Sequence, residues 1–133
     1  STFTYHSEGS AAMRNFQKYH VYQQALQFTR TTRSIVRNFP REEQFVLSTQ
    51  FIRAADSITL NFAEGAGATS EREFARFLQI AVRSAHECVG CLDIAHHNAF
   101  ISPETYDHHV KTVNELIAML VSFRRTVLGN RQA

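Results

Sequence analysis

The sequence predicts an all-α protein that folds as an antiparallel, up-down-up-down four-helix bundle. Apolar residues recur every three to four positions in four long stretches, and no stretch alternates with the two-residue period of a strand. Only two prolines and five glycines occur, and most of them fall where the helical period breaks. Short connections between successive helices favour antiparallel neighbours, which gives the up-down-up-down order.

Length and composition fit one domain of this kind. The chain has 133 residues, of which 44% are hydrophobic and 20% are charged, a composition that supports one core and excludes a disordered chain or a disulfide scaffold. No apolar run approaches the roughly 18 residues of a membrane span, so no membrane association is expected. Residues 1–12 are small and polar, precede Met13 and are expected to be an expression leader, with residues 13–133 as a single four-helix-bundle domain.

The first helix is expected over residues 19–38 and ends at the Phe39-Pro40 pair, because a residue before proline is driven out of helical geometry. Its core stripe is Val21, Ala25, Phe28, Thr32, Ile35 and Phe39. The second helix is expected over residues 42–63 and ends at the Gly65-Ala66-Gly67 break. Its core stripe is Leu47, Phe51, Ala54, Ile58 and Phe62.

The third helix begins after Ser70, which forms a capping box with Glu73. Its core stripe is Phe74, Leu78, Ala81, Ala85, Cys88, Leu92 and Ala95. The fourth helix begins at Ser102-Pro103-Glu104, an N-cap followed by proline at the first helical position and an acid in the first turn, and Gly129 is expected to close it. Its core stripe is Tyr106, Val110, Val113, Ile117 and Leu120.

Four arginines gather on the side of the first helix that lies opposite its core. Arg30, Arg33 and Arg37 share this side, and Arg41 extends the line past the proline. A solvated face is one explanation, because charged residues oppose the core on any surface helix. However, no acid occurs between Arg14 and Arg41, so these cations lack a partner on their own helix. The face is therefore expected to be available to an external anion.

The second helix carries apolar residues on its outer side as well as on its core stripe. A helix that is apolar all round is normally buried all round, which in a bundle of four helices requires another chain. Arg53 and Asp56 lie on the same outer side at a spacing that lets them pair within the helix or reach across an interface. The sequence therefore predicts an oligomer interface formed by Phe45, Ile52, Arg53, Asp56 and Leu60.

The histidines of the last two helices suggest a metal site only weakly. A dimetal bundle needs two carboxylate-x-x-histidine pairs and a glutamate from each remaining helix, and the first helix has no acid. A looser single-ion site would use Asp93, His97, His108 and His109. Adventitious metal binding is the alternative, and no cofactor is expected.

Nothing in the sequence predicts catalysis. Cys88 and Cys91 have the spacing of a zinc or redox pair, but a second pair is lacking, so small buried thiols in a reducing, cytoplasmic setting are the simpler interpretation. No nucleophile has a recognisable flanking motif, and the Gly65-Ala66-Gly67 break follows a helix rather than the strand of a phosphate loop.

The net charge of +2 does not by itself indicate a nucleic-acid partner. Only Lys18 and Lys111 of the 14 basic residues are lysine. Arginine pairs well with phosphate and carboxylate, although a GC-rich coding bias gives the same excess. Leaving out Glu8 of the expected leader makes the chain more basic, and an oligomer would multiply the charge.

Several segments together resemble the four-helix-bundle family encoded by intervening sequences in bacterial large-subunit ribosomal RNA genes. They are residues 16–26 (FQKYHVYQQAL), 39–43 (FPREE), 53–58 (RAADSI), 61–65 (NFAEG) and 73–78 (EFARFL), with Ser84 and Glu87. The resemblance implies a small cytosolic bundle without enzymatic activity, similar to the accessory variability determinant protein of diversity-generating retroelements. That protein assembles as a ring-like homopentamer and presents a basic surface to nucleic acid and to a reverse transcriptase.

The matching residues Asn61, Glu64 and Gly65 are expected to have structural roles. Glu64 is unfavourable beside the negative end of a helix, so an arginine from the third helix or another subunit is its expected partner. Gly65 is expected to supply a left-handed residue that lets the chain turn.

Three functional hypotheses remain open at this point. The first is a homo-oligomer that binds RNA or DNA phosphates through the first-helix arginines and through Arg72, Arg76 and Arg83. The second is a protein-interaction scaffold that docks an enzyme partner such as a reverse transcriptase. The third is a metal-binding bundle.

Overall fold

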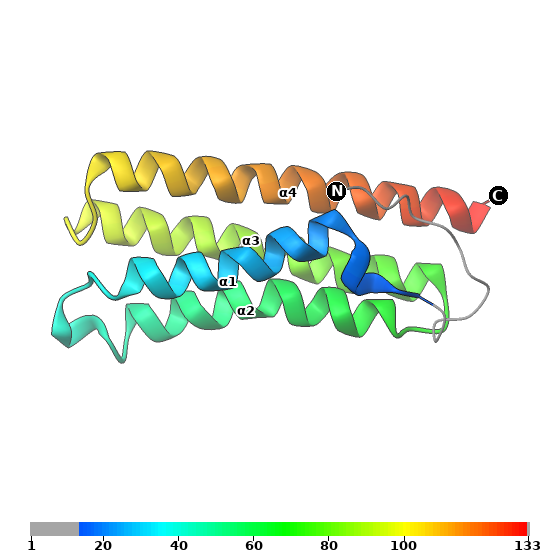
Figure 1. Ribbon diagram of the computed structural model, residues 1–133, viewed down its shortest axis with the longest axis horizontal. Coiled ribbons are helices and arrows are strands. Elements are labelled where there is room, and N and C mark those ends of the chain that lie inside the picture. The colour runs from blue at the N-terminus through cyan, green and yellow to red at the C-terminus, as the bar shows by residue number, and fades with distance from the viewer. Residues whose placement is uncertain (1–13, 133) are drawn as a thin grey trace.

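Four long helices run alternately up and down along one axis in the computed structural model, which describes residues 14–132, with side chains as far as residue 129. The helices are α1 (His20–Val36), α2 (Leu47–Ala66), α3 (Glu71–His97) and α4 (Pro103–Gln132), with short 3-10 turns η2 (Phe16–Lys18) and η3 (Arg41–Glu43). The α1–α2 and α3–α4 connections lie at one end of the bundle and the α2–α3 turn at the other (Figure 1). The all-α, four-helix prediction is confirmed. The expected leader, residues 1–12, lies outside the described residues.

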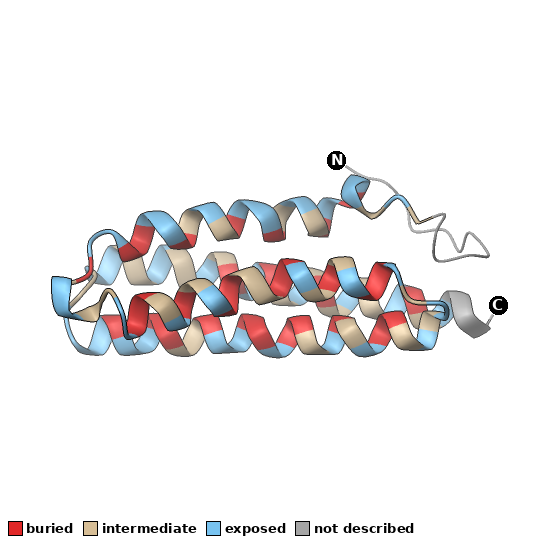
Figure 2. Cartoon of the chain, turned by 90° about the horizontal axis from the view of Figure 1, so that it is seen from below, coloured by how far each residue is buried: buried red, intermediate tan, exposed pale blue. Residues whose placement is uncertain are grey.

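The core lies between the helices, where their buried faces meet (Figure 2). Every residue of the core stripes expected for the first three helices is buried. Phe62 and Phe74 pack edge to face with ring centroids 5.7 Å apart, and Phe123 of α4 lies 5.2 Å from Phe62. This aromatic group joins α2, α3 and α4 near the α2–α3 turn, and edge-to-face contacts of this kind add to the stabilisation from area burial.

The stripe predicted for α4 is only partly correct. Val113 and Leu120 are buried, but Tyr106, Val110 and Ile117 are half-buried. Further core positions are Leu116 and Val127. Because α4 packs closely on α3 and only lightly on α1, its buried face is narrower than that of α3. Gly129 also does not end the helix, which continues to Gln132.

The predicted start of α2 at residue 42 is wrong. Residues 41–43 form η3, and the regular helix begins at Leu47 after Val46, whose φ and ψ of −120° and −90° are not helical. The side chain of Gln44 donates hydrogen bonds to the carbonyl oxygens of Val36 and Phe39, 3.4 and 3.2 Å away. Gln44 is thus held against carbonyl groups at and just beyond the end of α1, and the regular part of α2 begins only after it.

The two predicted helix starts at serines are confirmed. Ser70 Oγ accepts a hydrogen bond from the Glu73 amide at 3.0 Å, and Ser102 Oγ accepts one from the Thr105 amide at 3.1 Å. At the far end of α3, Ala99 has a φ of 61°, so the turn into α4 uses a left-handed residue without a glycine.

Gly65 does not have the role expected from the sequence. It lies inside α2 rather than at a left-handed end position, and the helix ends at Ala66. A Cβ atom at Gly65 would lie 2.6 Å from Phe77 Cβ and 3.0 Å from Phe74 Cδ1. Gly65 therefore leaves room for Phe74 and Phe77 of α3 to pack against α2, a packing role rather than a turn role.

No helix within residues 14–132 combines the length and the apolar character that a membrane crossing would need.

Candidate functional site

The arginine face predicted on α1 is present, and it is divided into paired and unpaired residues. Arg30, Arg37 and Arg41 are exposed, and no ion pair with any residue of the described range involves them. Arg30 and Arg37 lie seven residues apart, about 10 Å along the helix. Because the α1 sequence contains no acid, their positive charge is not neutralised from their own helix.

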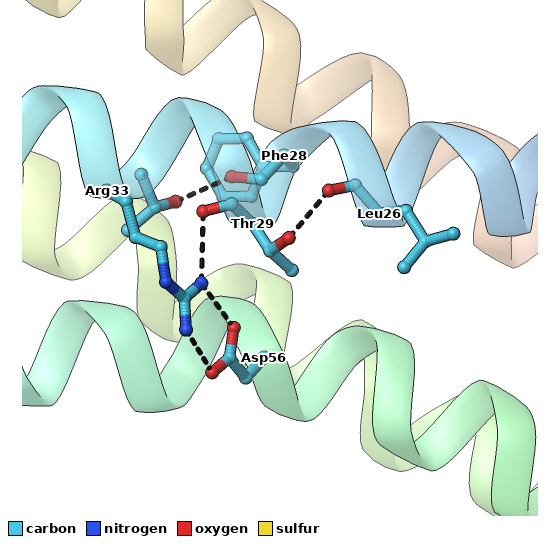
Figure 3. Close-up of polar contacts among 6 residues, drawn as sticks. Leu26, Phe28, Thr29, Arg33 and Asp56 are labelled. Atoms are coloured by element: carbon cyan, nitrogen blue, oxygen red, sulfur yellow. Dashed lines mark hydrogen bonds and ion pairs between the residues drawn. The ribbon is translucent and has the colours of Figure 1, made fainter.

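Arg33 differs from its neighbours because it is already paired. Its guanidinium donates two hydrogen bonds to the Asp56 carboxylate of α2, at 2.9 and 2.8 Å, and a third to the Thr29 carbonyl oxygen at 3.2 Å (Figure 3). This bidentate contact raises the pKa of Arg33. The expectation that Arg33 is free for an external anion is therefore wrong, and so is a pairing of Asp56 with Arg53 on its own helix.

Two grooves flank the unpaired α1 arginines. The first lies between α1 and α2 and has a volume of about 460 Å³. Its lining includes the Arg33–Asp56 pair, the unpaired Arg30 and Arg37, and the apolar side chains of Leu26 and Leu60. Thr59 also lines it, and the buried Thr59 Oγ1 has no hydrogen-bond partner within the described part of the chain. This groove therefore combines an ion pair, two unpaired arginines and two apolar side chains.

The second groove lies between α1 and α4 and has a volume of about 690 Å³. Arg30 and Arg37 line it from α1, and Thr105 and His109 line it from α4. No carboxylate is among the residues that line it. Both grooves are lined by Arg30 and Arg37, and the first adds Arg33 together with its counter-charge Asp56. The second groove therefore differs in holding no carboxylate, not in its net charge.

The α3 arginines are more dispersed than those of α1. Arg72 and Arg83 are exposed, but Arg76 pairs with Glu73 through two 3.0 Å hydrogen bonds and lies over the Phe77 ring, 4.5 Å from its centroid. The hydrogen bonds to Glu73 raise the pKa of Arg76, with a smaller effect from the charge of Glu64. Glu64 is exposed and makes no ion pair with any residue of the described range. The pairing expected with an arginine of the third helix is therefore not seen, and a pairing with another subunit stays a prediction.

The predicted interface residues lie on the outside of the bundle, although not all on one helix. Phe45 is 91% exposed and Leu60 is 64% exposed. Phe45 precedes α2 because that helix starts at Leu47, so it belongs to the connection at the end of the bundle together with the exposed Val46. Arg53 is exposed, whereas Ile52 and Asp56 are partly buried.

Asn61 takes part in a hydrogen-bonded group where α2 meets α3. Its side-chain amide donates to the Ser57 carbonyl and to Ser57 Oγ, at 2.8 and 2.9 Å, and Ser57 Oγ shares a 2.8 Å hydrogen bond with Ser84 Oγ. The direct partner of Asn61 is therefore Ser57, which in turn connects it to Ser84 of α3.

The weak metal site has no geometric support. Asp93 instead accepts a hydrogen bond from the Tyr106 hydroxyl at 2.5 Å, and His108 and His109 contact each other edge to face. Within the described residues, no group of three histidine, cysteine, aspartate or glutamate side chains could hold a metal ion. The structure therefore does not bring Asp93, His97, His108 and His109 together as metal ligands within the described range.

Two features of the site were not predicted from the sequence. His109 enters the α1–α4 groove, and its Nδ1 is buried without a hydrogen-bond partner in the described part of the chain. Arg14 donates hydrogen bonds of 2.6 Å to the carbonyl oxygens of Ala66 and Ala68 and also pairs with Glu71, so that it holds the α2–α3 turn. The residue pattern along one helix cannot predict the position of His109 in the groove or the contacts of Arg14, because each brings together segments that are far apart in the sequence.

Comparison with known proteins places this fold in a family. No curated protein matches the chain. A solved structure from Bacteroides thetaiotaomicron, described as a protein with unknown function from the S23 ribosomal protein family, is similar, with a TM-score of 0.70 and 26% identity over 78% of this chain and 97% of that one. The model of the 23S rRNA-intervening sequence protein family matches residues 17–122, and the chain belongs to this family.

Proposed function

We propose that this protein is a non-enzymatic homo-oligomer that binds RNA or DNA phosphates through exposed arginine side chains. The observation that carries the proposal is the pair Arg30 and Arg37, both exposed on an acid-free helix and both without an ion-pair partner among the described residues. Arginine is suited to phosphate because its planar guanidinium makes paired hydrogen bonds. Arg41, Arg72 and Arg83 are further exposed arginines that could contact phosphates from other elements of the chain.

Binding of this kind does not require a large net charge per chain. Contacts to phosphates supply affinity without reading the base sequence. Assembly repeats each arginine pair around the oligomer, and we propose a ring-like homopentamer in the cytoplasm on the basis of the family resemblance. The exposed apolar side chains of Phe45, Val46 and Leu60 support a contact between copies.

The salt dependence of binding tests the phosphate contacts. A double variant, Arg30→Gln with Arg37→Gln, should bind a mixture of single-stranded RNAs more weakly, and its log–log salt slope should fall by about 1.4, from two contacts at roughly 0.7 each. The matched control, Lys111→Gln with Arg125→Gln, removes the same charge from exposed positions of α4 and should leave the slope near that of the wild type. Binding that does not weaken as salt rises would contradict the proposal.

Light scattering tests the assembly. The wild type should have the mass of several chains, and Phe45→Ser with Leu60→Ser should lower that mass while circular dichroism stays helical. The control Lys111→Ser should leave the mass unchanged. A wild-type protein with the mass of one chain would contradict the proposed oligomer. It would also remove the argument that assembly repeats the arginine pairs on one particle.

A second function, a scaffold that docks an enzyme such as a reverse transcriptase, is favoured by one observation. Phe45 and Val46 are both strongly exposed at one end of the bundle, where an apolar contact with another protein can form. A partner that survives nuclease treatment and is lost from Phe45→Ser would support docking. A partner that is lost after nuclease treatment would instead be held through nucleic acid, which would support the first proposal.

A further inference from the structure

The α1–α4 groove contains more than the exposed arginines that the proposed function uses. Its lining includes hydroxyl and amide groups as well as the two guanidinium groups and one imidazole, so it offers hydrogen-bond donors from both walls. The polar residues that matter here are Arg30, Ser34, Arg37, Asn38, Thr105 and His109. The volume of about 690 Å³ is within the range of small-ligand sites.

The groove exists because α1 packs mainly on α2 and only lightly on α4. Ile35, which is buried, is the apolar residue among those that line the groove. The other lining residues are polar and come from both sides of the groove.

His109 is the residue that sets this groove apart from a plain basic surface. Its Nδ1 is buried and has no hydrogen-bond partner within the described residues. A buried polar atom without a partner costs free energy unless a ligand or water satisfies it. A neutral imidazole can carry its proton on Nδ1 and donate it to an acceptor in the groove.

The electrostatic surroundings of His109 favour an anion as that acceptor. Burial lowers the pKa of His109, and the adjacent His108 lowers it further. Arg30 and Arg37 face the groove from α1, and no carboxylate lines it. Two permanent positive charges therefore lie in the same groove as an unpartnered ring nitrogen that can act as a donor, and the lining residues supply no negative charge.

We propose that the α1–α4 groove is a phosphoryl-binding site in which Arg30 and Arg37 pair with phosphate oxygens and His109 donates a hydrogen bond through Nδ1. Phosphate fits because it offers several acceptor oxygens and pairs with guanidinium groups. The α1–α2 groove is lined by the same two arginines but also by the Asp56 carboxylate, which repels phosphate oxygens, so it is the poorer site for this group. The phosphoryl group can belong to a small phosphorylated molecule or to a nucleic-acid chain; the second case rests on the proposed function.

Calorimetric titration with inorganic pyrophosphate, alongside RNA binding, tests this site. Pyrophosphate should bind the full-length wild type, and His109→Leu should weaken it about tenfold because one hydrogen bond to an anion is lost. His109→Asn, which keeps a donor near the Nδ1 position, should retain most of the affinity. His20→Leu, an exposed histidine at the start of α1, is the matched control and should bind as the wild type does.

The outcomes separate this site from the proposed function. Competition between pyrophosphate and RNA, with both weakened in His109→Leu, supports a site filled by nucleic-acid phosphates. Pyrophosphate binding that depends on His109 while RNA neither competes nor responds supports a site for a small phosphorylated ligand. RNA binding that depends on Arg30 and Arg37 but not on His109, with no His109-dependent pyrophosphate binding, overturns the site and leaves the proposed function standing. If neither pyrophosphate nor RNA binds, both the phosphoryl-binding site and the proposed function are overturned.

Discussion

Arg33 of α1 and Asp56 of α2 form a bidentate ion pair that joins the two helices on their outer surface, with guanidinium to carboxylate distances of 2.9 and 2.8 Å. The two side chains are 46% and 34% exposed, so water screens the attraction and the pair adds little to folding. Its larger effect is on the surface charge, because it places one carboxylate beside the two unpaired arginines of α1.

Asp56→Asn should therefore change binding more than stability. We expect a free energy of unfolding lower by less than about 1 kcal/mol, as for exposed ion pairs. RNA affinity should rise, because Arg33 becomes available and a repelling charge is removed. Urea unfolding and RNA titration measure the two effects, and Glu115→Gln, an exposed acid on α4, is the control. Lower RNA affinity in Asp56→Asn would contradict the role given to this pair.

Gly65→Ala should destabilise the protein, although alanine is the better helix former. The new Cβ would lie 2.6 Å from Phe77 Cβ and 3.2 Å from the Phe74 carbonyl oxygen, so α2 and α3 would have to separate. Overpacking of this kind costs about 1–3 kcal/mol. Urea unfolding should show a lower midpoint for Gly65→Ala than for the wild type.

Gly90→Ala is the matched control for this prediction. Gly90 lies within α3, and a Cβ there would meet nothing within 4 Å. The same substitution should be neutral or stabilising by up to about 1 kcal/mol, because alanine loses less conformational freedom in a helix. Equal midpoints for the two variants would mean that the close approach at Gly65 is not a constraint.

The contrast between these two glycines shows what the sequence can and cannot predict. Helical periodicity identified the buried stripes of α1, α2 and α3, because a residue's angle around its own helix follows from its position in the chain. It did not identify the packing role of Gly65 or the partner of Asp56, because each depends on how two helices are rotated against each other. The start of α2 was missed for a similar reason, since Gln44 is held by carbonyl groups at the end of another helix.

The candidate functional residues show the same difference between what one helix reveals and what depends on the packing of two helices. The arginine row on α1 was visible as a pattern on one helix, whereas the contribution of His109 appears only when α4 is placed beside α1. The α4 stripe was partly wrong because one helical period predicts a face of constant width, while α4 packs closely on only one neighbour.

Arg14→Gln should destabilise the α2–α3 turn. The guanidinium donates to the Ala66 and Ala68 carbonyl oxygens and to the Glu71 carboxylate, and the Arg14 side chain is only 5% exposed. Removing a cation from such a site leaves buried acceptors short of donors, which costs about 2–4 kcal/mol. Thermal and urea unfolding should both show the loss.

Two variants test whether geometry or charge matters at Arg14. Arg14→Lys keeps the charge but cannot reach three acceptors in a planar arrangement, so it should recover only part of the stability. Arg41→Gln, at an exposed arginine without an ion pair among the described residues, should leave stability within about 0.5 kcal/mol of the wild type. Full recovery by lysine would contradict the geometric role.

The buried thiols of Cys88 and Cys91 should make stability fall at alkaline pH. Burial raises the pKa of both thiols, that of Cys91 from 9.0 to about 11 and that of Cys88 further. In the unfolded chain each thiol loses its proton near its ordinary pKa, so between these values the folded protein holds more protons than the unfolded chain. Stability from this source is therefore complete below about pH 9 and is lost as the pH rises toward and through 11.

Urea unfolding at several pH values measures this loss when the wild type is compared with the double variant Cys88→Ala with Cys91→Ala. The tyrosines and lysines that titrate in the same range are common to both proteins, so their contributions cancel. The gap between the two proteins should narrow as the pH rises, and a thiol reagent at pH 8 should react with the native wild type far more slowly than with the unfolded chain, since the thiolate is the reactive form. Parallel curves for the two proteins would contradict the prediction.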